Sequence, residues 1–169
     1  MTQSTAENRT ADFPQRADLE ERRSGPNFSL GRIGKPENLM RYGVRHPSTR
    51  STIPGKVFLH DPLDLTSMEI SFGLIPAQTS IPFFHKHKQN EEVYLFIRGE
   101  GQFRVDDQIM EITEGTAIRV APAGVRSCRN TSSQDMFYIV IQAKEGSLEQ
   151  WTGTDGIGVP GEVTWPEAK

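Results

Sequence analysis

The sequence predicts an all-β domain, and two observations lead to this fold class. From residue 56 onward, short apolar or alternating runs recur between turns marked by glycine, proline and aspartate. Strands at this spacing favour a sandwich or barrel over an α/β fold, so little helix is expected. The run Val93–Ile97 is apolar on both faces, whereas a strand with one solvated face would alternate. A second layer must therefore cover the outer side of this strand.

The N-terminal third is predicted to contain little regular structure. Residues 1–26 are polar and charge-dense, and we expect a flexible arm there because too little apolar surface is available to offset the entropy cost of ordering. The alternative is a short helix over residues 17–23 that docks on the domain or on a neighbouring subunit. Residues 27–55 are expected to form an irregular lead-in. Within it, Pro36 can begin one helical turn, because its missing amide hydrogen would have no helical partner at that position.

Residues 56–145 form the predicted β-domain. Its strands are expected at residues 57–59, 67–74, 81–87, 93–97, 102–105, 109–112, 116–120 and 136–143. The tail, residues 146–169, carries Trp151 and Trp165 among glycines. We expect these tryptophans to pack the tail on the domain rather than to bind a ligand.

Composition and charge narrow the class of protein. The 169 residues (19.0 kDa) suffice for one domain with its own core. A formal net charge of −3 and an isoelectric point near 5.8 lack the basic surplus of a nucleic-acid-binding surface, so no nucleic-acid partner is expected. No apolar run approaches the roughly 20 residues that cross a bilayer, so no membrane contact is expected. The single cysteine, Cys128, and the absence of a signal-like segment after Met1 predict a cytoplasmic protein.

The stretch His85-Lys86-His87 predicts a metal site. Two histidines two positions apart on an extended strand point to the same face, so both imidazoles can reach one ion. Glu92 could add a carboxylate oxygen and complete a three-ligand site for a divalent ion such as iron, manganese, nickel or zinc. The histidine pair by itself is also typical of two polar side chains on a strand. Because imidazoles bind metal only when neutral, acid is expected to release the ion.

These residues also carry a resemblance to a known family. The segment 81–130 resembles the cupin superfamily, whose first motif is G-x5-H-x-H-x3-4-E-x6-G. Four positions of this motif are matched, by His85, His87, Glu92 and Gly99. The opening glycine is missing, and Thr79 stands in its place. The resemblance implies a cupin-like double-stranded β-helix, or jelly-roll barrel, with a ligand in the barrel mouth.

The second cupin motif, G-x5-P-x-G-x2-H-x3-N, is matched only in part. Gly115 and the run Pro122–Gly124 fit it approximately. Counted forward from Gly124, the histidine position falls on Ser127, and Asn130 then comes one residue early. A serine hydroxyl is a poor ligand for late first-row ions, so Ser127 is expected to line the pocket and to hydrogen-bond a metal-bound water. Cys128 could reach the ion only if the strand register slipped by one residue.

The first motif also predicts which side chains face the interior. With Glu92 inward, Tyr94 and Phe96 are expected to line the pocket, and the outward side chains are Val93, Leu95 and Ile97. Tyr94 is either a proton donor or a core aromatic residue with a satisfied hydroxyl group. Another strand layer or a second subunit is expected to cover the outward stripe, as in many cupin dimers, so we expect a homodimer.

The resemblance leaves the reaction open, because cupins include dioxygenases, decarboxylases, isomerases, epimerases, storage proteins and ligand-sensing domains. The first hypothesis is a protein that binds a divalent metal and a small polar molecule in the barrel mouth, as a metal-dependent oxygenase, isomerase or decarboxylase. The alternative is a non-catalytic module that binds or senses a small ligand without metal. Arg119 and Arg126 are either solvated or contacts for an anionic substrate. His46 and His60 are expected to lie outside the site.

Overall fold

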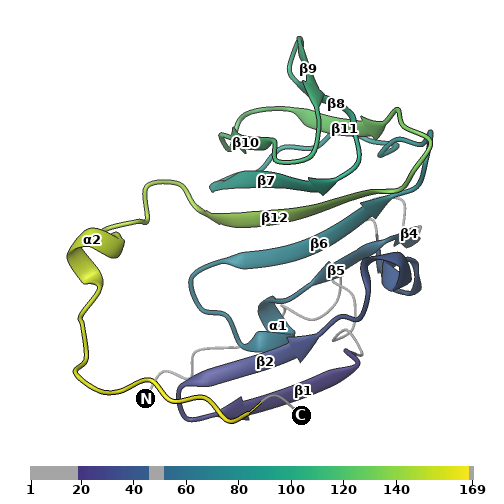
Figure 1. Cartoon of the computed structure of the whole chain (residues 1–169). Helices are drawn as coiled ribbons and strands as arrows, with labels where there is room; N and C mark the ends of the chain where they lie inside the picture. Colours follow the sequence, from purple (N-terminus) through teal and green to yellow (C-terminus); the bar gives the residue numbers. More distant parts are fainter. Residues whose placement is uncertain (1–18, 46–51, 168–169) are drawn as a thin grey trace, which may run out of the picture.

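Two antiparallel β-sheets that pack face to face form the main body of the protein (Figure 1). The computed structural model describes residues 19–45 and 52–167. The strands of the two sheets are β5 (Lys56–Phe58), β6 (Glu69–Ile75), β7 (Asn90–Arg98), β8 (Gly101–Val105), β9 (Gln108–Ile112), β10 (Ala117–Val120), β11 (Arg126–Asn130) and β12 (Met136–Lys144). The larger sheet has the order β10-β7-β12-β6-β5, and the smaller has the order β11-β8-β9. The predicted all-β class is confirmed.

The space between the sheets is filled by side chains from both of them. Along β7, residues Tyr94 and Phe96 are buried, while Val93 and Leu95 on the opposite face are only partly buried. The buried members of this interior cluster are Ile75, Tyr94, Phe96, Phe103, Ile112, Val120, Cys128, Met136, Tyr138 and Val140. Because the period of a strand is two residues, the apolar alternation in the sequence predicted this face directly. The predicted inward orientation of Tyr94 and Phe96 is confirmed.

The expected closed barrel is not formed. Within residues 19–45 and 52–167, no strand pairing links the larger sheet to the smaller one. The larger sheet ends in β5, which has only three residues. The predicted strand at residues 81–87 is reduced to an isolated bridge between His85 and Arg126. Neither β5 nor the segment 81–87 therefore forms a continuous hydrogen-bond ladder between the two sheets. The fold is an open two-sheet sandwich.

A second core lies on the outer face of the larger sheet. The short helix η1 (Pro36–Arg41) covers part of this face, and the buried residues between them are Leu39, Tyr42, Val57, Leu74 and Phe137. The helical turn predicted at Pro36 is confirmed and is a six-residue 3-10 helix. The N-terminal side of the chain thus covers the part of this face formed by β5, β6 and the start of β12, and not the apolar run Val93–Ile97.

The N-terminal region contains more strand than predicted. Strands β1 (Glu21–Gly25) and β2 (Phe28–Arg32) form an antiparallel hairpin, and β3 (Gly43–Arg45) pairs with β4 (Thr52–Pro54). The expected arm at residues 1–26, the alternative helix at 17–23 and the irregular lead-in at 27–55 are therefore wrong where they fall on described residues. The two-residue turn after Gly25 explains the difference, because hairpin pairing uses backbone groups and needs few apolar side chains. Residues 1–18 and His46 lie outside the described residues.

The C-terminal tail does not pack on the domain in this single chain. Residues 146–167 are exposed throughout, and Figure 1 shows them leaving β12 and running away from the two sheets. Trp151 and Trp165, expected to pack the tail, are 64% and 84% exposed. The only regular element in this part is the four-residue helix α2 (Thr152–Asp155), and a second short helix, α1 (His60–Leu63), follows β5. Across the described parts of the chain, none of the helices is long and apolar enough to cross a membrane.

Candidate metal centre

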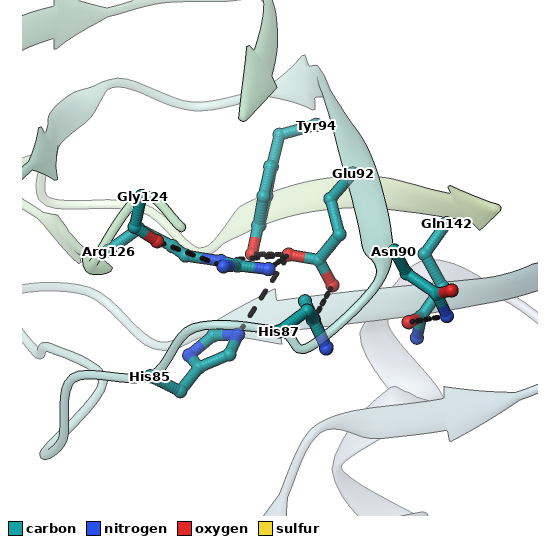
Figure 2. Close-up of polar contacts among 8 residues, drawn as sticks. All are labelled: His85, His87, Asn90, Glu92, Tyr94, Gly124, Arg126 and Gln142. Atoms are coloured by element: carbon teal, nitrogen blue, oxygen red, sulfur yellow. Dashed lines mark hydrogen bonds and ion pairs between the residues drawn. The ribbon is translucent and has the colours of Figure 1, made fainter. Parts of the chain in front are cut away.

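His85, His87 and Glu92 come together at one end of the interior. Glu92 points inward from β7 and is 5% exposed. The segment before β7 is held to the other sheet by its backbone, because the His85 amide donates to the Arg126 carbonyl (3.2 Å) and the His87 amide donates to the Pro122 carbonyl (3.0 Å). These backbone bonds hold both imidazoles next to the Glu92 carboxylate (Figure 2).

The three side chains offer metal-binding atoms at short mutual distances. His87 Nε2 lies 2.9 Å from Glu92 Oε1, and His85 Nε2 lies 3.8 Å from Glu92 Oε2. One ligand atom from each residue can be chosen so that all three lie within 4.8 Å of one another. Among the described residues, His85 Nδ1 and His87 Nε2 are buried nitrogen atoms without a hydrogen-bond partner. The contact of His87 with Glu92 thus has ion-pair distance without hydrogen-bond direction. Buried polar atoms are rarely left unpaired, so such atoms indicate a missing partner.

The second carboxylate oxygen of Glu92 is already fully engaged. Glu92 Oε2 accepts hydrogen bonds from the Tyr94 hydroxyl (2.5 Å), from Arg126 Nε (3.0 Å) and from Arg126 Nη2 (2.6 Å), as Figure 2 shows. Arg126 Nη1 donates to the Gly124 carbonyl at 3.0 Å. The guanidinium group is completely buried. Glu92 is therefore held by one oxygen, while its Oε1 faces the imidazole of His87.

These contacts determine the charge of Glu92. Burial by itself would raise the pKa of Glu92, but the contacts with His85, His87 and Tyr94 and the positive charge of Arg126 together hold it well below its ordinary value. Burial, reinforced by the charge of Glu92, raises the pKa of Tyr94 well above its ordinary value. The site thus contains an ionised carboxylate and a neutral phenol. Of the two roles weighed for Tyr94, the structure shows a core aromatic residue whose hydroxyl group is satisfied.

The orientation of strand β11 differs from the expectation. Arg126, Cys128 and Asn130 are buried, whereas Ser127 is partly exposed and donates to the Ile81 carbonyl at 3.2 Å. Ser127 therefore points away from the three candidate ligands, and Arg126 takes the inward position. Arg126 is not a solvated residue either. The sequence contained a signal for this orientation: counting back from Asn130 through x3, instead of forward from Gly124, places Arg126 at the histidine position of the motif.

Lys56, at the start of β5, is a further polar side chain that the sequence pattern did not single out, and it is partly buried. Its Nζ lies 5.0 Å from the ring centroid of Tyr138 and 5.6 Å from that of Phe58. Burial lowers the pKa of Lys56 to about 8, although the negative charges of Glu92 and Glu69 oppose this shift. The alternation of β5 could have indicated the direction of Lys56. Val57 belongs to the outer core, so its neighbours Lys56 and Phe58 point to the opposite face of the sheet.

The remaining sequence candidates lie away from this cluster. Phe96 is a core residue that stacks on Tyr138 and meets Phe103 edge to face. His60 is half-exposed on α1 and contacts its neighbour Asp61 at 2.8 Å, as expected for a histidine outside the site. Arg119 is exposed and pairs with Glu91 and Glu145.

Comparison with known proteins agrees with this architecture. The family model described as a cupin domain matches residues 72–142. A cupin protein from Bacteroides fragilis is 41% identical over 62% of this chain and 89% of its own, with a TM-score of 0.60. A predicted oxalate decarboxylase from Thermotoga maritima is 23% identical over 44% of this chain and 64% of its own (TM-score 0.42). A Photorhabdus luminescens protein is 18% identical over 53% of this chain and 74% of its own (TM-score 0.48).

The match to the Bacteroides fragilis protein is the one that decides the family, since it combines 41% identity with coverage of nearly all of that chain. The other two resemblances are too distant to indicate a substrate or a reaction. No curated protein matches the chain. Because the chain matches the Bacteroides fragilis cupin protein and the cupin-domain family model, it belongs to the cupin superfamily.

Proposed function

We propose that this cupin domain binds one divalent metal ion through the side chains of His85, His87 and Glu92, and that the ion binds a small polar molecule. The observation that carries the proposal is the convergence of the three donor atoms within 4.8 Å, two of the imidazole nitrogens being buried without partners. Metal bonds of about 2.0–2.2 Å place neighbouring ligand atoms roughly 3 Å apart, a spacing close to the 2.9 Å between His87 Nε2 and Glu92 Oε1. A small rotation of the His85 side chain would bring its imidazole nitrogen to the same ion.

The surroundings of Glu92 fit a metal ligand. Tyr94 and Arg126 both bind Oε2, so they orient the carboxylate and leave Oε1 available for an ion. The low pKa of Glu92 keeps the carboxylate ionised, as metal binding requires. Two histidines and one carboxylate leave coordination positions open for water or substrate.

The chemistry follows from such an open ion. A metal held this way polarises a carbonyl or enol oxygen or lowers the pKa of bound water, which are the steps on which an oxygenase, isomerase or decarboxylase depends. The protein side chains supply the fixed carboxylate, the two imidazoles and the buried Arg126, whose positive charge remains beside the ion. We infer that the site favours oxygen ligands on the substrate.

A second function, binding of a small molecule without metal, is favoured by one observation. Arg126 already supplies Glu92 with a positive partner through two hydrogen bonds. The carboxylate is thus charge-compensated without an ion. In that case the histidines would contact the ligand directly, and the domain would be a binding or sensing module.

Metal analysis of the tag-free protein separates the two functions. After incubation with iron(II), manganese, nickel or zinc and desalting, we expect about one metal ion per chain in the wild type. The His85→Ala, His87→Ala and Glu92→Gln variants should lose the ion, and the control His60→Ala should keep it. Circular dichroism checks that each variant folds. Metal-free wild-type protein under all four conditions would refute the metal site and support the binding module.

A further inference from the structure

Lys56 lies where a lysine is seldom found. It is the first residue of β5 and is partly buried, and its amine lies 5.0 Å from the ring centroid of Tyr138 and 5.6 Å from that of Phe58. Among the described residues, no carboxylate, carbonyl or hydroxyl group forms a hydrogen bond or an ion pair with this amine. A lysine withdrawn from water is normally paired, so an amine with only aromatic neighbours leaves a place for an anion.

The register of the strands directs Lys56 into the interior. Lys56 pairs with Gly73 of β6, and Gly73 pairs with Tyr138 of β12, so the three residues form one row across the inner face of the larger sheet. A Cβ atom added to Gly73 would lie 2.6 Å from the hydroxyl oxygen of Tyr138, which therefore lies over Gly73. The missing side chain of Gly73 thus lets the phenol group extend from β12 toward Lys56.

Two hydroxyl groups face the same part of the interior. Tyr138 is 4% exposed, and Ser71, two residues before Gly73 and on the same face of β6, is 2% exposed. Within the described ranges neither side chain forms a hydrogen bond. Burial raises the pKa of Tyr138 well above its ordinary value, so its hydroxyl group stays neutral and can donate. An amine and two hydroxyl groups are therefore available there as donors.

The carboxylates nearest to Lys56 are bound elsewhere. Glu92 is held by the contacts described above, and Oε1 of Glu69 accepts hydrogen bonds from the backbone amides of Leu59 (3.1 Å) and His60 (2.8 Å). Burial lowers the pKa of Lys56 to about 8, a value still above neutral pH. The amine is therefore mostly protonated near pH 7 and acts there as a cation rather than as a nucleophile.

The charges that act on Lys56 place its amine between the two sheets. Glu92 of β7 influences the pKa of Lys56, and Lys56 in turn influences the pKa of Cys128 of β11. Such effects are appreciable only over roughly 10 Å, so the amine lies in the same interior as the candidate metal ligands. Because β5 is the last strand of the larger sheet, this part of the interior lies at an open edge.

We propose that Lys56 and the hydroxyl group of Tyr138 bind an anionic oxygen group, a carboxylate or a phosphate, of the small molecule that enters the interior. The anion site itself requires no metal. Together with the metal site it names a class of substrate, a small acid whose other oxygen atoms reach the ion, and this extension rests on the proposed function.

Metal-free protein labelled with carbon-13 at the lysine ε-carbon reports on the amine directly, and the Lys56 signal is the one that Lys56→Met lacks. Malonate or inorganic phosphate, added at constant ionic strength, should move this signal to saturation. It should also raise the pKa of Lys56 above about 8, because a bound anion favours the protonated amine. The signal of Lys144, at the exposed end of β12, is the control and should not change. A response to malonate alone identifies a carboxylate site, and a response to phosphate alone identifies a phosphate site.

Calorimetry with the anion that responds measures the contribution of each group. Lys56→Met should weaken binding by about tenfold or more and Tyr138→Phe by about threefold, since the first removes a charge-assisted hydrogen bond and the second a neutral one. Lys144→Met changes the net charge equally and should bind like the wild type. The absence of a saturable response to both anions, or equal affinity of Lys56→Met and the wild type, would overturn the proposal.

Metal loading separates this inference from the proposed function. Lys56→Met should still take up the metal ion, because Lys56 makes no contact with the three candidate ligands. An anion that binds only to metal-loaded protein, and equally well to Lys56→Met, would be a ligand of the ion and would refute the Lys56 site alone. Anion binding at Lys56 in a protein that takes up no ion would refute the metal site and support the anion site.

Discussion

Arg126 on β11 and Glu92 on β7 form a buried ion pair that joins the two sheets. Its shortest distance is 2.6 Å, between Arg126 Nη2 and Glu92 Oε2, and both side chains are almost completely inaccessible to solvent. No strand ladder connects the sheets in the described ranges, so this pair, the apolar interior and the backbone hydrogen bonds from the segment before β7 to β11 hold them together. The same pair also orients the candidate metal ligand. The guanidinium group of Arg126 therefore both stabilises the packing of the two sheets and orients the candidate metal ligand Glu92.

Removing Arg126 should destabilise the protein strongly. Arg126→Met leaves the Glu92 carboxylate buried without its positive partner, and loss of one member of a buried pair costs about 3–5 kcal/mol. Urea unfolding of metal-free protein measures this loss. Arg119→Met breaks an exposed ion pair and serves as the control, with little expected change. Adding Glu92→Gln to Arg126→Met should recover part of the stability. Equal effects of the two arginine substitutions would contradict the structural role of the pair.

Lys56 should make the stability depend on pH in the alkaline range. Burial lowers its pKa from 10.5 to about 8, so between these values the unfolded chain binds more protons than the folded chain. Stability therefore rises with pH across this window, and below about 8 the folded protein bears the full cost of the buried charge. Lys56→Met should melt at a higher temperature than the wild type near pH 7, and the difference should shrink toward pH 10.5. Lys144→Met, at the exposed end of β12, is the control. A difference independent of pH would argue against the buried amine.

Cys128 should be chemically silent in the folded protein. It is 4% exposed, and burial raises the pKa of its thiol to about 12, although nearby Lys56 opposes the shift. Since the thiolate is the reactive form, a disulfide reagent at pH 8 should label native protein very slowly and one thiol per chain after denaturation. A Ser147→Cys variant adds an exposed thiol and should react at once. Rapid labelling of the wild type would mean that the interior opens.

Gly73 should not tolerate a side chain. A Cβ added to it would lie 2.2 Å from Cζ of Tyr138, whose ring crosses β6 at this position. Because that ring is packed in the interior cluster, Gly73→Ala should cost about 1–3 kcal/mol of unfolding free energy, as overpacking does. Gly161→Ala, where nothing lies within 4 Å, should be nearly neutral. Chemical denaturation of both variants tests the prediction, and similar midpoints would show that the ring can move aside.

Most of the β-domain was predictable, because its signals are local. Alternation along β7 and turns at glycine, proline and aspartate indicated the strands from β5 to β10 and the strand β12 within a few residues. The exceptions have a physical reason. The hairpin of β1 and β2 is held by backbone pairing between polar segments, which leaves little trace in hydrophobicity. The predicted strand at residues 81–87 contacts β11 only at separate points, through the backbone of Ile81 and His85, and Pro82 between them has no amide hydrogen for a continuous ladder.

Of the candidate site, only the residues of the first motif were predictable, and the residue contributed by β11 was not. His85, His87 and Glu92 are close in sequence, and their spacing was sufficient to bring them together. The prediction of Ser127 as an inward residue failed because a shift of one residue in a strand reverses the direction of every side chain. The pairing of Cys128 with Phe103 of β8 determines that direction, and no local pattern in β11 reveals it.

The sequence by itself determined the all-β class, through short-range periodicity, and the three side chains that converge at one end of the domain, through their close spacing, while the cupin family followed from the resemblance of the motif around them. Only the tertiary structure decided that Arg126 rather than Ser127 faces Glu92, that Lys56 lies among aromatic rings, and that the side chains of the tail stay exposed. These features depend on contacts between segments far apart in the chain. Such contacts arise from the register of paired strands and from burial, which appear only once the sheets have assembled.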